Sequence, residues 1–187
     1  MISPIANLFL YLKNSLSALA DAHGIKYFSF IDQDLGQLDQ SSASRRPAVA
    51  LPAALIDISG ITYSSKAEKV QSGECTVRIS LVFAPLSATS SLSPDEYTQK
   101  ALYCYELEQL VSQSVHGATP AYSDGSGPDL LQNVFGKFNR TASETLNRKD
   151  GLRVRELTFK IAFDDYSLQS GTALHPASFS LTEEMII

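Results

Sequence analysis

The chain has 187 residues, of which 44% are hydrophobic and 19% charged, a composition typical of one folded domain and not of a disordered chain. Its formal net charge of −5 argues against bulk attraction to nucleic acid or to an anionic membrane, although it allows a local basic patch. The apolar segment 5–19 is interrupted by Asn7, Lys13, Asn14 and Ser15, so neither a membrane span nor a secretion signal is predicted.

The first predicted element is a helix from Pro4 to His23. Ser3 can cap its start, and a proline suits the first helical turn because its missing N–H would be unpaired there. Gly24 is placed to end the helix, and His23 would then lie at the negative end of the helix dipole. Apolar residues recur every three or four positions and form one stripe, made of Ile5, Leu8, Phe9, Leu12, Leu16 and Leu19.

Three strands are predicted to follow this helix. Residues 25–31 are rich in aromatic residues and favour a first strand, and the polar residues 32–46 favour a loop. Residues 48–58 predict a second strand at a sheet edge or with a bulge, because Pro52 cannot donate a ladder hydrogen bond. Residues 60–73 are interpreted as a connection, with or without a short strand at Ile61–Ser64, and the strict alternation over residues 74–84 predicts the third strand.

A second helix is predicted to begin at Ser93 and to end at His116, before Gly117. Ser93 and Glu96 have the spacing of a capping box, in which each side chain accepts from the backbone N–H of the other residue. His116, like His23, would then cap helical carbonyl groups. The apolar face of this helix consists of Tyr97, Ala101, Cys104, Leu107, Val111 and Val115.

The chain then predicts a long antiparallel hairpin with strands at 136–147 and 152–164, joined by turn residues 148–151. Runs of strands rather than strict alternation predict an α+β fold, with a mostly antiparallel sheet of four to five strands and two main helices packed on one face. We expect a single domain over residues 1–167 and a C-terminal tail over 168–187. The residues expected to be buried are Leu8, Leu12, Leu16, Val77, Ile79, Leu81, Leu107, Phe159 and Ile161.

The sequence offers no recognisable catalytic, cofactor-binding or metal-binding motif, and we therefore predict that the protein is not an enzyme. Cys75 and Cys104 do not form a CxxC pair and are expected to be buried, reduced thiols. The histidines His23, His116 and His175 fall in separate segments without ligand spacing.

Basic residues gather on the last hairpin and its turn. One interpretation is a solvated hairpin tip, and the other is an electrostatic contact with a partner protein or a non-specific contact with passing DNA. The candidate interface residues are Arg140, Arg148, Lys149, Arg153 and Arg155, together with Pro52 on the predicted edge strand.

The amino-acid sequence of several predicted strands resembles that of prophage tail terminator or tail completion (head–tail neck) proteins. The resemblance covers most of residues 4–167 and includes Arg46-Pro47-Ala48-Val49, residues 74–83, residues 138–144, and the closing strand from Leu152 to Asp165. It implies a structural subunit that self-associates into a ring, for example a ring of six copies. This ring would cap the tail tube and contact the head connector. Such a subunit would be cytoplasmic during assembly and then lie in the virion tail or neck. The alternative is a small α+β binding domain or enzyme of unknown substrate.

Overall fold

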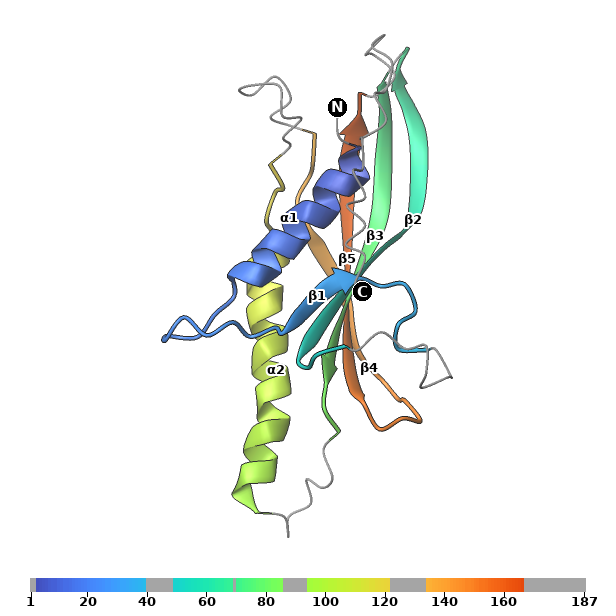
Figure 1. The fold of residues 1–187 in the computed structure, drawn as a ribbon. Coiled ribbons are helices and arrows are strands. Elements are labelled where there is room, and N and C mark those ends of the chain that lie inside the picture. The colour runs from blue at the N-terminus through green and yellow to red at the C-terminus, as the bar shows by residue number, and fades with distance from the viewer. Residues whose placement is uncertain (1–2, 40–48, 69, 86–93, 122–133, 167–187) are drawn as a thin grey trace, which may run out of the picture.

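The computed structural model describes residues 3–39, 49–68, 70–85, 94–121 and 134–166 (Figure 1). The order of elements is helix, three strands, helix and two strands, as the sequence predicts. The predicted tail, with His175, lies outside the described residues. In chain order the elements are α1 (Pro4–Ala18), β1 (Phe30–Gln33), β2 (Ala53–Ala67), β3 (Val70–Phe83), α2 (Asp95–Val115), β4 (Asn139–Leu146) and β5 (Arg153–Asp165).

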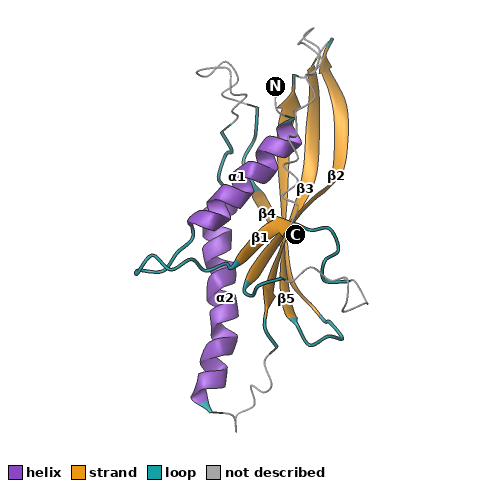
Figure 2. Ribbon diagram, in the orientation of Figure 1, coloured by secondary structure: helices purple, strands orange, loops and turns teal. Residues whose placement is uncertain are grey.

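The strands form one five-stranded sheet in the order β1-β2-β3-β5-β4 (Figure 2). Only β1 and β2 pair in parallel, and the other neighbours are antiparallel. Side chains of both helices join the same core cluster as one face of β3 and β5. The predicted fold class is therefore confirmed: an α+β protein with a mostly antiparallel sheet and both helices on one face.

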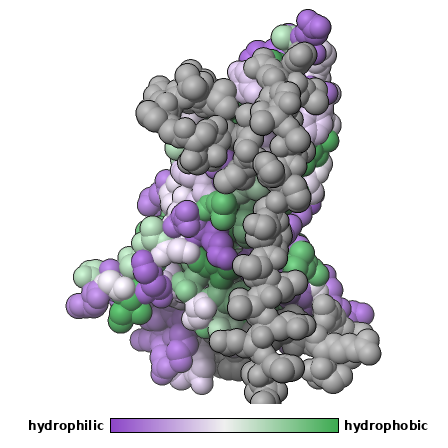
Figure 3. Space-filling model, turned by 45° about the horizontal axis from the view of Figure 1, so that its top comes forward, coloured by the Kyte–Doolittle hydropathy of each residue, from purple (hydrophilic) through white to green (hydrophobic). Residues whose placement is uncertain are grey.

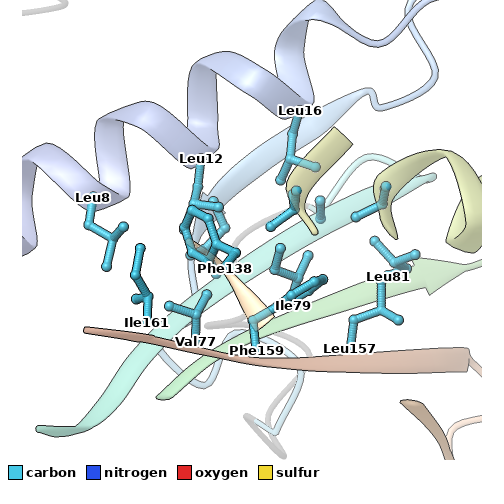
Figure 4. Close-up of a cluster of buried hydrophobic side chains, with 14 of the residues drawn as sticks. Leu8, Leu12, Leu16, Val77, Ile79, Leu81, Phe138, Leu157, Phe159 and Ile161 are labelled. Atoms are coloured by element: carbon cyan, nitrogen blue, oxygen red, sulfur yellow. The ribbon is translucent and has the colours of Figure 1, made fainter. Parts of the chain in front are cut away.

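The main core lies between that face and the helices. In Figure 4 the leucines of α1 point toward alternate residues of β3 and β5, and Phe138 lies among them. All nine residues that the sequence predicts to be buried are 0–1% exposed. A smaller cluster lies on the other face of the sheet and consists of Leu38, Ala53, Leu55, Val82 and Val154.

The prediction that residues 60–73 form a connection is wrong, apart from the short strand at Ile61–Ser64 that it allowed. β2 continues to Ala67 and β3 begins at Val70, so the two strands form a long hairpin. The polar sequence of this stretch hides the strand because its outer part is exposed and needs no alternating apolar residues. The pairing shifts between Ser59 and Thr62, where Gly60 has a φ of 59°. Glycine tolerates that angle, and the extra residues form a bulge.

Pro52 does not lie inside a strand, which corrects the prediction for residues 48–58. β2 begins at Ala53, and the Pro52 carbonyl accepts a hydrogen bond of 2.9 Å from the Ser29 N–H. The first four residues of β2 pair with β1, so this end of the strand is not an edge. From Asp57 onward no described strand pairs with the outer side of β2, and there it is an edge.

The helix ends also differ from the prediction. α1 ends at Ala18, and His23 lies in the following turn rather than in the helix. A carboxylate oxygen of Asp21 accepts from the N–H groups of His23 (2.8 Å) and Ile25 (2.9 Å), so this turn satisfies backbone donors without a helix.

The second helix keeps its predicted C-terminal end, and its start is described from Pro94 onward. Pro94 occupies the N-cap position of α2 without a side-chain cap, and Ser93 lies outside the described residues. Glu96 accepts a hydrogen bond of 2.5 Å from Lys100, one turn further along the helix. His116 immediately follows the last helical residue, where the sequence places the helix end.

Gly73 is required by the packing of β3 against β5. Its cross-strand neighbour is Phe163, and a Cβ atom at Gly73 would lie 2.5 Å from Cζ of that ring. Tyr63 meets the same ring edge-on at 5.9 Å between centroids, which limits the room for Phe163 to move. We expect Gly73→Ala to lower the free energy of unfolding by about 1–3 kcal/mol in urea denaturation, because the ring must shift. Ser72→Ala is the control, and equal stabilities of the two variants would contradict the expected clash.

Candidate functional site: a polar groove between α2 and β4

A groove with a volume of about 720 Å³ lies between α2 and the last two strands. Its helical wall consists of α2 residues three or four positions apart, namely Tyr105, Glu108, Ser112 and His116, with Gln109 and Gln113 beside them. Arg140 of β4 and Arg155 of β5 line the other wall. The groove is therefore polar on both sides and lies where α2 passes the edge strand of the sheet.

Glu108 and Arg155 form an ion pair within this groove. The nearest Arg155 nitrogen lies 2.7 Å from Oε2 of Glu108, and the two side chains are only 14% and 12% exposed. Ser143 donates to the other carboxylate oxygen, and Arg155 also donates to the hydroxyl groups of Ser143 and Thr145. The charge of Arg155 is thus compensated inside the protein, and the pair joins α2 to the closing hairpin.

Arg140 has no such compensation within the part of the chain that the structure describes. Its Nη1 donates to Oγ of Ser112 at 2.6 Å, and among the described residues no carboxylate pairs with it. The Arg140 backbone N–H donates to Nδ1 of His116 at 3.1 Å, so a neutral His116 ring carries its proton on Nε2. The groove therefore has net positive charge and further hydrogen-bond donors on one wall.

The remaining predicted interface residues are not part of this groove. Arg153 packs its guanidinium 4.8 Å from the ring centre of Tyr105, a cation–π contact. Arg148 pairs with Asp39 at 2.7 Å and Asp150 at 3.0 Å, and its hydrogen bond to Asp150 is the main cause that raises its pKa. Lys149, next to it in the turn, is exposed.

The five basic residues that the sequence groups on one hairpin thus lie in different settings. The structure brings Arg140 and Arg155 together, stacks Arg153 on α2, and ties Arg148 to the segment that follows β1. Arg148 also donates to the Leu38 carbonyl, which anchors that segment over the smaller core cluster. Pro52 lies immediately before β2, apart from the groove.

The thiols are buried, as predicted, and burial is the main cause that raises both thiol pKa values. The pKa of Cys75 rises to about 11, so the thiol is protonated and a poor nucleophile at neutral pH. Within the described ranges no three His, Cys, Asp or Glu side chains are grouped to hold a metal ion. Of the helices that the structure describes, neither is long and apolar enough to cross a membrane.

The fold defines the class of this protein as an α+β domain with two helices on one face of a five-stranded mixed sheet. No protein-family model matches the chain. No curated protein sequence matches it either. Among solved structures, the chain is similar to one from the "Virion of native gene transfer agent (GTA) particle", at 13% sequence identity and a TM-score of 0.46. That alignment covers 86% of this chain and 97% of the other.

Proposed function

We propose that this chain is a structural subunit of a phage-type particle, which associates with copies of itself into a ring in the tail or neck. In this role it caps the tail tube and joins it to the head connector. It is assembled in the cytoplasm and then becomes part of the virion, and a ring of six is one compatible size. The observation that best supports assembly is the outer edge of β2 from Asp57 to Ala67, with which no described strand pairs.

A free strand edge offers unpaired N–H and C=O groups to a neighbouring chain. Six consecutive β2 residues from Thr62 to Ala67 are exposed, and in Figure 3 the outer end of the β2–β3 hairpin, at the upper right, is mostly pale to purple. The bulge at Gly60 and the charge of Lys66 oppose non-specific pairing, whereas residues 62–65 carry no charge. This short segment is therefore suited to a selective contact between subunits.

The turn between β4 and β5 is the second proposed contact. A ring needs two different surfaces on each subunit, one of which meets the other on the next copy. Lys149 is exposed on this turn, and Arg148 holds the turn in place through Asp39 and Asp150. In a protein of net charge −5, such a lysine favours contact with an acidic neighbour or with DNA passing through the ring.

The test is particle assembly in cells whose own copy of this protein carries Thr62→Lys on the β2 edge or Lys149→Glu on the turn. Both residues are exposed, so we expect folded variants that nevertheless give tails of abnormal length or tails that fail to join heads. Electron microscopy of the particles measures both outcomes.

Lys26→Glu is the matched control, because it makes the same charge change on the connection between α1 and β1. We expect normal particles from this variant. Normal tail length and head joining in both Thr62→Lys and Lys149→Glu would remove the β2 edge and the turn from the interface.

A further inference from the structure

We propose that the groove between α2 and β4 binds an acidic side chain on an extended segment of a partner protein, which adds to the free edge of β4. The proposal rests on the groove and on the edge strand, and it holds whether or not the chain forms a ring. It assigns a ligand chemistry, a carboxylate on a β-strand, to a site whose residues come from α2 and the closing hairpin.

The charges in the groove select an anion. Glu108 is neutralised by Arg155 and accepts from the Ser143 hydroxyl group, so among the described residues the guanidinium of Arg140 is the charge in the groove without a countercharge. One of its nitrogens is held by Ser112, which orients the planar group, and further N–H donors remain for a carboxylate. The Nε2 proton of a neutral His116 is a second donor, on the helical wall of the groove.

The backbone beside the groove is ready to pair with a strand. β4 is the last strand of the sheet and pairs with β5 alone among the described strands. Seven of its eight residues are exposed, and only Leu146 is partly buried. Arg140 pairs with Phe159 and Ser143 with Leu157, so both β4 side chains lie on the face that α2 covers.

An added strand would place its own side chains on that same face. Directly opposed residues in neighbouring strands have Cβ atoms about 4.5–5.5 Å apart, within reach of the Arg140 guanidinium. An Asp or Glu opposite Arg140 would thus enter the groove, while the backbone of the added strand pairs with β4. Main-chain pairing supplies affinity, and the carboxylate supplies specificity.

The sequence of this chain argues that the partner is a different protein. A second copy could also offer the outer edge of β1, which is only four residues long, or that of β2 from Asp57 onward. On the β2 edge Asp57 already pairs with Arg78 at 3.1 Å, and residues 59–67 contain no acidic residue. The one carboxylate of the β2 edge, that of Asp57, is therefore already paired within its own subunit. In this arrangement β2 and the β4–β5 turn make the contacts between copies of this chain, and β4 binds a different protein.

The test is an NMR titration of the ¹⁵N-labelled protein with an acetylated, amidated pentapeptide, Thr-Val-Glu-Val-Thr, and with its Gln analogue. We expect saturable shifts of backbone amides in β4 and in the second half of α2 with the Glu peptide. We expect the Gln peptide to bind about tenfold more weakly, since the charge-assisted hydrogen bonds to Arg140 are lost. Arg140→Gln should cause a similar loss for the Glu peptide and leave the Gln peptide unaffected.

Lys160→Gln is the control variant, because Lys160 lies at the same end of the hairpin but pairs with Glu74 rather than with groove residues. It should leave binding of the Glu peptide unchanged. Equal binding of the two peptides by the wild-type protein, shifts confined to other strands, or no saturable shift at millimolar peptide would each overturn the proposal. Self-association through β4 in the absence of peptide would also overturn it, because a second copy would then be the occupant.

Discussion

Leu12→Ala is expected to lower the free energy of unfolding by about 2–5 kcal/mol, the usual cost of removing a leucine from a well-packed core. Leu12 is 0% exposed and points from α1 into the cluster that β3 and β5 complete (Figure 4). The rigid sheet on one side and α2 on the other limit collapse around the cavity, so much of the lost contact would not be regained. Urea denaturation measures the change.

Leu10→Ala is the matched control, because it makes the same substitution in the same helix at a residue that is 45% exposed. Helix propensity changes equally in the two variants, so their difference isolates burial. If both variants lost the same stability, α1 would not be packed on the sheet as described.

Glu108→Gln is expected to lower the free energy of unfolding by about 3 kcal/mol, because it leaves the guanidinium of Arg155 largely buried without a countercharge. The amide keeps the size of the side chain, so the cost comes from charge and hydrogen bonding rather than from a cavity. The partial exposure of the pair, at 12–14%, places the expected cost at the lower end of the range for buried pairs. Urea denaturation at low and high salt measures it, and little salt dependence is expected.

Glu106→Gln removes the same charge from an exposed position in the same helix and should leave stability almost unchanged. Replacing both partners, as Glu108→Leu with Arg155→Met, should restore most of the stability, because no charge is then left unpaired. A double variant no more stable than Glu108→Gln would show that the ion pair is not the source of the loss.

The sequence predicts the fold class and the core well because those features depend on local periodicity. The stripe of α1 and the alternation in β3 and β5 each identify a buried face, and the structure confirms that these faces meet. Turn residues 148–151 likewise predict the closing hairpin, since a short polar turn between two alternating strands usually joins them as an antiparallel pair.

The outer half of the β2–β3 hairpin could not be predicted in the same way. Its residues are exposed, so pairing with β3 rather than a buried face keeps them extended. The predicted length of α1 is wrong for a related reason. The Asp21 carboxylate offers the backbone donors of the turn a local partner, and this competes with a continued helix despite the favourable Gly24.

Only one wall of the groove, the basic one, could be predicted from the sequence. The arginines of the last hairpin are noticeable as a charge cluster, but their partners lie on α2, far away in sequence. Glu108 and Ser112 follow Cys104 at four-residue steps and therefore lie on the buried face of α2. Two polar residues on an otherwise apolar helix face were the signal in the sequence that indicated a polar site. Only the fold shows that this row faces Arg140 and Arg155.

The position of β5 between β3 and β4 has a consequence for how the chain reaches its native state. β3 pairs along its length with a strand from the far end of the domain, and Glu74 and Lys160, which bridge the two, are 86 residues apart in sequence. Such non-local pairing slows folding, because a long segment must close before its contacts form. During synthesis β3 emerges with one edge exposed until β5 follows, so the domain completes its sheet only after nearly all of the described chain has been made.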